Sequence, residues 1–164
     1  MDGYSRRLLA WRLCQNMEGI NAQILVTETK ELYPDAGRAR IISDNGSQFI
    51  SKDFEELLVL LEYEHTLTSA NHPQSNGKLE RFNRTIKTEH VRRTAYVNYQ
   101  DAYQRMAKWI AYYNSERLHS AIWYLTPNDV FHGRTVDRLA ERKEKLHTAF
   151  IKRQEYWRVK NVGS

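Results

Sequence analysis

Two acidic residues, Asp44 and Glu80, stand where their carboxylates could hold a divalent cation. Asp44 ends a short apolar run, residues 40–44, which Asn45 and Gly46 stop, and this pattern predicts a buried strand followed by a turn. Glu80 follows a polar loop and stands near the start of a helix predicted through about residue 93. Mg²⁺ prefers carboxylate oxygens, and two such ions can stabilise the attacking and leaving oxygens of a displacement at phosphorus. The pair therefore predicts metal-dependent phosphodiester chemistry.

Three polar residues follow Glu80 at helical spacing. Asn83, Arg84 and Lys87 lie three, four and seven positions after it, so all four side chains project from about the same face. The other face is apolar, with Leu79, Phe82 and Ile86. Each pattern also has an ordinary structural explanation, because Asp-Asn-Gly is typical of a turn and a Glu–Lys pair is typical of a surface helix.

The elements that must position these residues alternate between strands and helices. Apolar periodicity predicts helices over residues 21–33, 54–61, 99–114 and 136–158, with Ser51 as the N-cap of the second. Residues 65–70 are predicted to form another strand, and residues 4–13 a strand or a hairpin. This alternation predicts an α/β sandwich with a mostly parallel or mixed sheet, in which active-site residues gather at the carboxyl ends of strands.

Composition excludes several classes of protein. The chain has 164 residues, of which 41% are hydrophobic and 12% aromatic, so it suits one folded domain rather than a disordered chain. No apolar stretch approaches the length of a membrane span, and the N-terminus lacks a secretory signal. A single cysteine, Cys14, cannot form an internal disulfide or supply a zinc-ligand cluster. We therefore expect a soluble, cytoplasmic protein that does not bind membranes.

The positive charge is concentrated at the C-terminal end. The chain has a formal net charge of +5, and residues 134–164 carry nine Lys and Arg residues, Arg153 among them, against four Asp and Glu residues. Clustered cations of this kind bind a polyanion, because each neutralised phosphate releases counterions. A solvated helix face is the alternative explanation for the same cluster.

Taken together, the motifs resemble those of one protein family. Residues 43–49 (SDNGSQF) and 71–87 (NHPQSNGKLERFNRTIK) are similar to the segments that carry the second and third catalytic carboxylates of retroviral-type integrases and insertion-sequence transposases. The 35 residues between Asp44 and Glu80, and the lysine seven places after Glu80, match that family. Residues 113–119 (YNSERLH), Thr126-Pro127 and residues 2–6 extend the likeness over about residues 2–133.

The resemblance implies a fold and a reaction. The fold is ribonuclease H-like, with three layers and a central mixed sheet flanked by helices. Two Mg²⁺ or Mn²⁺ ions bind an Asp, Asp, Glu triad, and the enzyme cleaves DNA ends and joins them to target DNA. Asp44 and Glu80 would be the second and third of these carboxylates, and Lys87 would contact DNA. The further DNA-binding candidates are Asn83, Arg84, Arg117, His119 and Arg153. Residues 1–133 would form the catalytic core and residues 134–164 a basic helical tail.

The family's first catalytic aspartate lies on a strand upstream of the segment that residues 2–6 resemble. We therefore expect an N-terminally truncated core that lacks its first strand and holds metal poorly. Exposed strand edges favour pairing with another chain, so we expect a homo-oligomer, associating through the sheet or the aromatic helices. Three interpretations stay open: an active polynucleotidyl transferase, a catalytically dead DNA-binding remnant, and an unrelated nucleic-acid-binding module.

Overall fold

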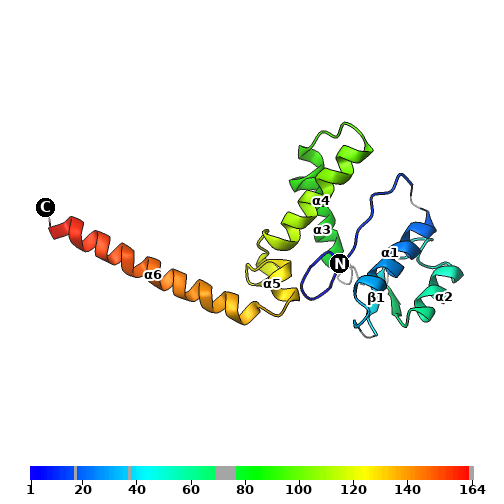
Figure 1. The fold of residues 1–164 in the computed structure, drawn as a ribbon, viewed down its shortest axis with the longest axis horizontal. Helices are drawn as coiled ribbons and strands as arrows, with labels where there is room; N and C mark the ends of the chain where they lie inside the picture. Colours follow the sequence, from blue (N-terminus) through cyan, green and yellow to red (C-terminus); the bar gives the residue numbers. More distant parts are fainter. Residues whose placement is uncertain (17, 37, 69–76, 163–164) are drawn as a thin grey trace. The chain divides into compact units, whose positions relative to one another are not determined.

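The computed structural model describes residues 1–16, 18–36, 38–68 and 77–162, and the chain divides into two compact units, Met1–Ile110 and Ala111–Ser164 (Figure 1). The elements are, in order, α1 (Gly19–Leu32), β1 (Arg40–Ser43), α2 (Lys52–Leu60), β2 (Glu64–Leu67), α3 (Gly77–Glu89), η2 (Val91–Arg93), α4 (Tyr99–Ser115), η3 (Ser120–Ile122), α5 (Pro127–Phe131) and α6 (Thr135–Val162). None of the helices in these ranges is both long enough and apolar enough to cross a membrane.

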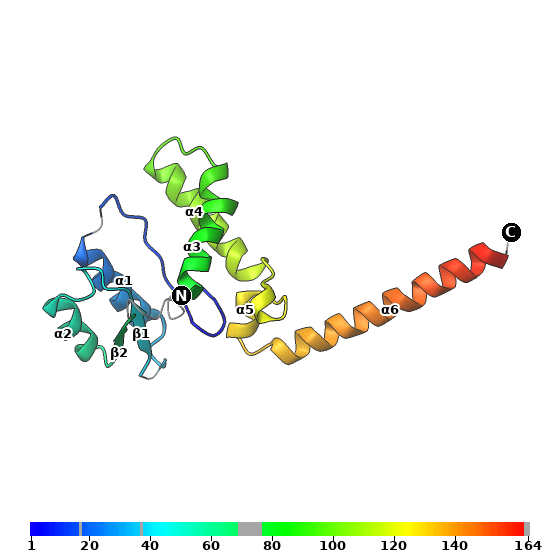
Figure 2. The same ribbon diagram turned by 180° about the vertical axis from the view of Figure 1, so that it is seen from behind.

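The first unit contains a small parallel sheet. β1 and β2 pair from Arg40 opposite Glu64 to Ser43 opposite Leu67, and α2 connects them (Figure 2). Phe54 and Leu58 of α2 are almost fully buried and pack with side chains of α1 and β1. These contacts confirm the predicted α/β class.

The helix predicted after Ser51 is confirmed, together with its cap. α2 begins at Lys52, and the Ser51 hydroxyl accepts a hydrogen bond from the Phe54 backbone N–H at 3.4 Å. The apolar face of α2 is the one that is buried, because Phe54 and Leu58 are four residues apart. Local sequence signals therefore determine this element.

The prediction of a strand or hairpin over residues 4–13 is wrong. Residues 2–7 form a turn instead, in which a carboxylate oxygen of Asp2 accepts a hydrogen bond from the Ser5 backbone N–H at 2.7 Å. Partial burial acts to raise the pKa of Asp2, but the hydrogen bonds from Ser5 and the Tyr4 backbone, with the charge of the N-terminus, together lower it below its ordinary value. A strand forms only where a neighbouring strand satisfies its backbone, and β1 and β2 are the only strands in the described ranges.

The second strand is confirmed, with different bounds. β2 spans Glu64–Leu67, whereas the prediction extended to residue 70. Residues 69–76, which include most of the predicted polar loop, lie outside the described residues.

The second unit contains the predicted terminal helix and two short helices that were not predicted. α6 is one uninterrupted helix and confirms the prediction over residues 136–158. Before it, Ile122, Leu125 and Val130 form a small buried core, against which Leu139 of α6 packs. Thr126 caps α5 and Pro127 occupies its first turn, where its missing N–H costs nothing.

A buried carboxylate, Asp129, fixes the start of α6. It accepts hydrogen bonds from the Thr126 hydroxyl at 2.8 Å, from Arg134 Nε at 3.2 Å and from Arg138 Nε at 3.1 Å. Partial burial acts to raise the pKa of Asp129, but the hydrogen bonds from Thr126, Arg138 and Arg134 together lower it below its ordinary value.

Asp129→Asn is expected to destabilise the protein by about 1–2 kcal/mol, because the ion pairs with Arg134 and Arg138 lose their negative charge while the arginines stay half exposed to water. The lowered pKa means that Asp129 contributes stability above its ordinary pKa of 3.8 and that this contribution is lost as the pH falls through the folded-state value. Urea unfolding at pH 7 and pH 3 measures both effects. Asp137→Asn, at an exposed acid in the first turn of α6, is the control, and an equal loss there would contradict the prediction.

Candidate active site

Asp44 follows β1 directly and is exposed. Its Oδ1 accepts a hydrogen bond from the Gly46 backbone N–H at 3.0 Å, which closes the turn predicted from the Asp-Asn-Gly sequence. The preceding residue, Ser43, is buried, and its hydroxyl lies 2.9 Å from Nε2 of His65 on β2. The sheet therefore fixes the backbone just before Asp44, while the Asp44 carboxylate is exposed at the surface.

Glu80 lies in the first turn of α3, on an exposed polar face. Asn83, Arg84 and Lys87 are exposed as well, whereas Phe82 is half-buried and its ring lies 6.2 Å from that of Trp109 on α4. Lys78 Nζ donates a hydrogen bond to the Gly3 carbonyl at 2.9 Å and so connects the start of α3 to the N-terminal turn. The structure thus brings the four polar residues together on one face of α3.

The carboxylate donors suit a hard divalent cation, but they are few. The described residues contain no group of three or more His, Cys, Asp or Glu side chains that could hold a metal ion. Asp44 and Glu80 supply two carboxylates of the oxygen-donor type that Mg²⁺ prefers. Carboxylates of this kind fit the chemistry of the ion, and each of them singly would leave it most of its water ligands.

Arg117 and His119 belong to the second unit, in a cluster around the buried ring of Tyr113. The His119 ring meets Tyr113 edge to face at 4.7 Å, and Arg117 Nη1 lies 3.3 Å from the same imidazole. The His119 backbone N–H also donates to the Leu125 carbonyl. The side chains of Arg117 and His119 are both half-buried. They therefore stabilise the packing around Tyr113 and are also partly accessible to solvent.

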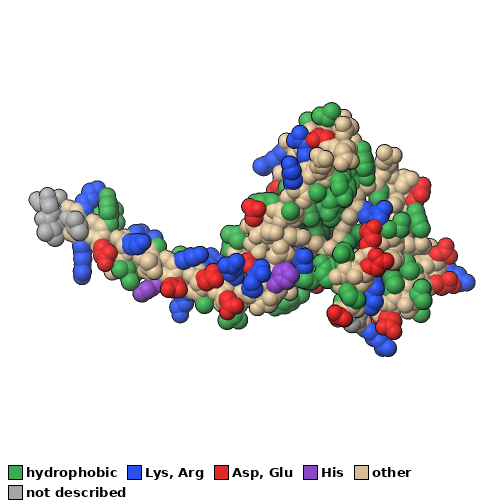
Figure 3. Space-filling model, in the orientation of Figure 1, with side chains coloured by type: hydrophobic (Ala, Val, Ile, Leu, Met, Phe, Trp, Pro, Cys, Tyr) green, Lys and Arg blue, Asp and Glu red, His purple; other side chains and the backbone are tan. Residues whose placement is uncertain are grey.

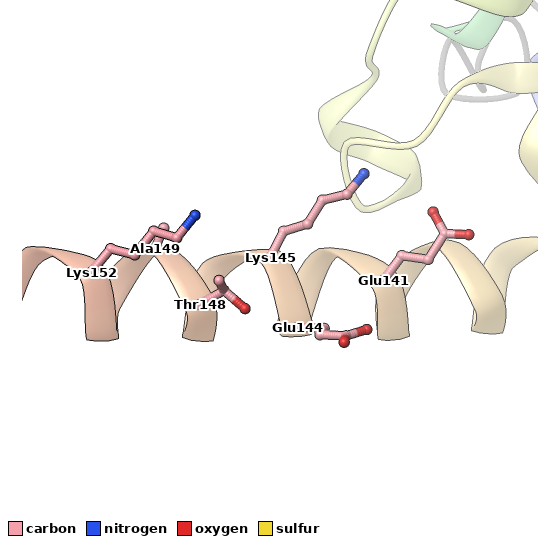
Figure 4. Close-up of a pocket in the computed structure, with 6 residues that line it drawn as sticks. All are labelled: Glu141, Glu144, Lys145, Thr148, Ala149 and Lys152. Atoms are coloured by element: carbon pink, nitrogen blue, oxygen red, sulfur yellow. The ribbon is translucent and has the colours of Figure 1, made fainter.

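Arg153 is exposed on α6, among basic side chains that Figure 3 shows spread along this helix with acidic ones between them. A shallow hollow on the same helix is lined by Glu141, Glu144, Lys145, Thr148, Ala149 and Lys152 (Figure 4). All six residues come from one helix, so the hollow is part of an open surface rather than an enclosed active site.

Sequence reasoning missed a buried histidine at the end of α3. His90 is 9% exposed, and its ring stacks on Trp109 at 5.7 Å and meets Tyr96 edge to face at 5.9 Å. Burial, and then the charge of Arg105, lower the pKa of the His90 imidazole below its ordinary value. The aromatic residues at positions 96 and 109 were the available signal, because a histidine between aromatic residues often belongs to a core.

The protein is expected to lose stability as the pH falls below 6.5, the ordinary pKa of histidine. The unfolded chain then binds a proton that the folded His90 binds only at lower pH, so unfolding becomes more favourable. His90→Phe keeps the stacking on Trp109 but removes the titratable imidazole. Between pH 7 and pH 5 the melting temperature of this variant should therefore fall less than that of the wild type. His147→Phe, at an exposed histidine, is the control, and identical pH profiles for wild type and His90→Phe would refute the assignment.

The sequence is similar to a known family of protein domains and to proteins of bacterial insertion elements. Two family models described as integrase core domain match residues 1–73 and 61–127, the first containing Asp44 and the second Glu80. An uncharacterised protein of insertion element IS136 from Agrobacterium fabrum is 28% identical over 142 residues, covering 83% of this chain and 73% of the relative. The transposase of insertion sequence IS904 from Lactococcus lactis is 27% identical over 132 residues, covering 79% of this chain and 51% of the relative.

Solved structures support the predicted fold. The catalytic core of BIV integrase aligns with a TM-score of 0.55 at 18% identity, covering 78% of this chain and 80% of that one. A chain of the simian T-cell lymphotropic virus intasome aligns with a TM-score of 0.60 at 17% identity, covering 73% and 42%. These alignments confirm the ribonuclease H-like fold.

Proposed function

Because the chain belongs to the integrase core domain family, we propose that it acts on DNA in transposition or integration, by metal-dependent cleavage and strand transfer. One observation carries the proposal: 35 residues separate Asp44, at the end of a parallel strand, from Glu80, in the first turn of α3, and both lie within the matched regions. The curated relatives include transposases of insertion sequences. The chain spans about half the length of the IS904 transposase, so the activity of a complete protein is part of the proposal.

We assign Asp44 and Glu80 as ligands of Mg²⁺ or Mn²⁺. A bound ion would supply charge stabilisation to the oxygens of the scissile phosphodiester. The exposed amide and cations beside Glu80 would bind and orient the phosphates of the DNA end, with Arg84 and Lys87 contributing the positive charge. Arg117 and His119 are proposed as further DNA contacts.

We further propose that residues 1–133 act as the catalytic core and residues 134–164 as a basic tail that binds DNA without regard to sequence. The exposed Arg153 and the other cations of α6 support the assignment of DNA binding to residues 134–164. α6 begins at Thr135, and the excess of basic over acidic residues lies in residues 134–164, so this helix carries it. Binding of this kind depends on phosphate neutralisation and therefore on salt.

A DNA-binding protein without turnover is the second candidate. The observation that favours it is the lack of a three-residue metal cluster in the described part of the chain. Two carboxylates provide less negative charge to hold a cation than three, so the ion would be bound more weakly. DNA contacts by the cations of α3 and α6 would persist without it.

Self-association is proposed for either candidate. β1 and β2 each have one neighbour among the described residues, so each leaves one edge for pairing with a second copy. Ile42 and Leu67 on these strands are 51% and 39% exposed, which adds apolar surface. Light scattering at about 100 µM is expected to give a mass above that of one 19.5 kDa chain, and a strictly monomeric mass would contradict the proposal.

Nicking of supercoiled plasmid with Mn²⁺, with and without EDTA, tests the proposed function. Nicking that EDTA abolishes supports the enzyme. Plasmid binding without nicking supports the second candidate, and neither binding nor nicking would contradict both. Mn²⁺ is the ion to use first, because it generally binds nitrogen and oxygen ligands more tightly than Mg²⁺.

A further inference from the structure

Two consecutive aromatic residues between η3 and α5 adopt a left-handed backbone conformation. Trp123 has φ 55° and ψ 30°, and Tyr124 has φ 57°. Their side chains are 55% and 56% exposed, whereas their neighbours Ile122 and Leu125 are buried in the core of the second unit. We call Trp123 and Tyr124 the aromatic turn.

The backbone of the aromatic turn is held in an unfavourable conformation. A side chain with a Cβ atom disfavours the left-handed region, which glycine enters freely. The same unit uses glycine at the next such position, Gly133, with φ 71°. Glycine would adopt this left-handed backbone conformation with less strain than Trp or Tyr. More than half of each aromatic side chain is exposed, so packing in the core does not explain why aromatic residues occupy these two positions.

Specific contacts fix the two residues in place. The Tyr124 backbone N–H donates to the His119 carbonyl at 2.8 Å. Arg142 of α6 donates from Nη1 to the Trp123 carbonyl at 3.1 Å, and its guanidinium lies 5.7 Å from the centre of the Tyr124 ring. The aromatic turn therefore holds two aromatic rings on a fixed backbone, with the guanidinium of Arg142 from α6 beside them.

We propose that the aromatic turn stacks on unpaired bases of DNA, an inference that rests on the proposed action on DNA. Flat aromatic side chains beside a cation are a means by which proteins bind single strands, because every base has a π-face and every nucleotide has a backbone phosphate. The charge of the surrounding unit is complementary to this ligand, since residues 111–164 contain ten Lys and Arg residues against six Asp and Glu residues. A fixed turn also reduces the entropy lost when a base binds.

Fluorescence anisotropy tests the proposal with two probes, a labelled oligothymidylate single strand and a blunt duplex of the same length, at one salt concentration. Trp123→Gly is expected to weaken single-strand binding about tenfold and duplex binding less than about twofold. Glycine fits the left-handed backbone, so this variant should melt at or above the wild-type temperature, which separates lost binding from lost folding. Trp123→Phe should retain most single-strand binding, and Tyr4→Ala, at an exposed aromatic residue of the first unit, should leave both unchanged.

The outcomes distinguish this inference from the proposed function. Unchanged single-strand binding by Trp123→Gly, or an equal loss on both probes, would overturn the stacking role alone. A change in sedimentation without a selective loss of single-strand binding would assign the aromatic turn to self-association instead and would also overturn it. Wild-type protein that binds neither probe would overturn the proposed action on DNA as well.

Discussion

Glu80→Gln is expected to reduce Mn²⁺-dependent plasmid nicking by roughly a hundredfold or more. A metal ligand contributes to transition-state stabilisation that amounts to several kcal/mol, and each 1.4 kcal/mol is worth about a factor of ten in rate. Glutamine keeps the shape and the exposed position of Glu80 in the first turn of α3 but removes the negative charge. Plasmid binding should be retained, because the neighbouring cations of α3 are unchanged.

A matched substitution separates a metal role from a general effect of charge. Glu55 is also exposed and also lies in the first turn of a helix, α2, so Glu55→Gln should nick at the wild-type rate. Asp44→Asn should behave like Glu80→Gln, because asparagine can still accept the hydrogen bond from the Gly46 N–H and the turn survives. Equal nicking by wild type and Glu80→Gln would remove Glu80 from the site.

Neutralising the cations in the last turns of α6 is expected to weaken duplex binding tenfold to a hundredfold, as an order of magnitude. The variant replaces with glutamine the four residues Lys152, Arg153, Arg158 and Lys160. Each cation that neutralises a phosphate contributes about one unit to the slope of log affinity against log salt, so the slope should fall by about three to four. Titrations between low and moderate salt measure both quantities.

The control for α6 carries the same change of charge elsewhere. Glutamine at four exposed cations of the first unit, Arg38, Arg40, Lys52 and Lys108, lowers the net charge equally. If binding depended on net charge alone, both variants would show the same loss, which would contradict a dedicated role for α6. Glutamine favours helices, so circular dichroism should confirm that α6 remains folded.

The elements that sequence reasoning predicted correctly are those with local signals. α2 has a serine cap and an apolar repeat, α3 has separate polar and apolar faces, and α6 has helix-favouring charged residues throughout. The turn after β1 followed from Asp-Asn-Gly, and the structure closes it with the hydrogen bond from Gly46 to Asp44. In each case the interaction that fixes the structure joins residues close together in the sequence.

The features that were missed depend on partners outside the element that contains them, or on the backbone conformation of a turn. Residues 4–13 have the composition of a strand, but composition does not supply a neighbouring strand with which to pair. The network of Asp129 needs two arginines on the following helix, and a single acid in a short segment gives no sign of it. The left-handed conformation of Trp123 was hidden because neither aromatic residues nor their spacing indicate that region.

The attachment of α6 through its first two turns has a consequence for how the protein unfolds. Arg138, Leu139 and Arg142 contact the rest of the second unit, whereas the described side chains of residues 143–160 are exposed apart from Ala149. Stability in that stretch comes from the helix's own hydrogen bonds and residue propensities rather than from a shared core. Its amides should therefore exchange with solvent deuterium by local fraying, far faster than those of α2. Heating should melt residues 143–160 gradually and separately from the two cores, and a mutation in either core should leave that process unchanged.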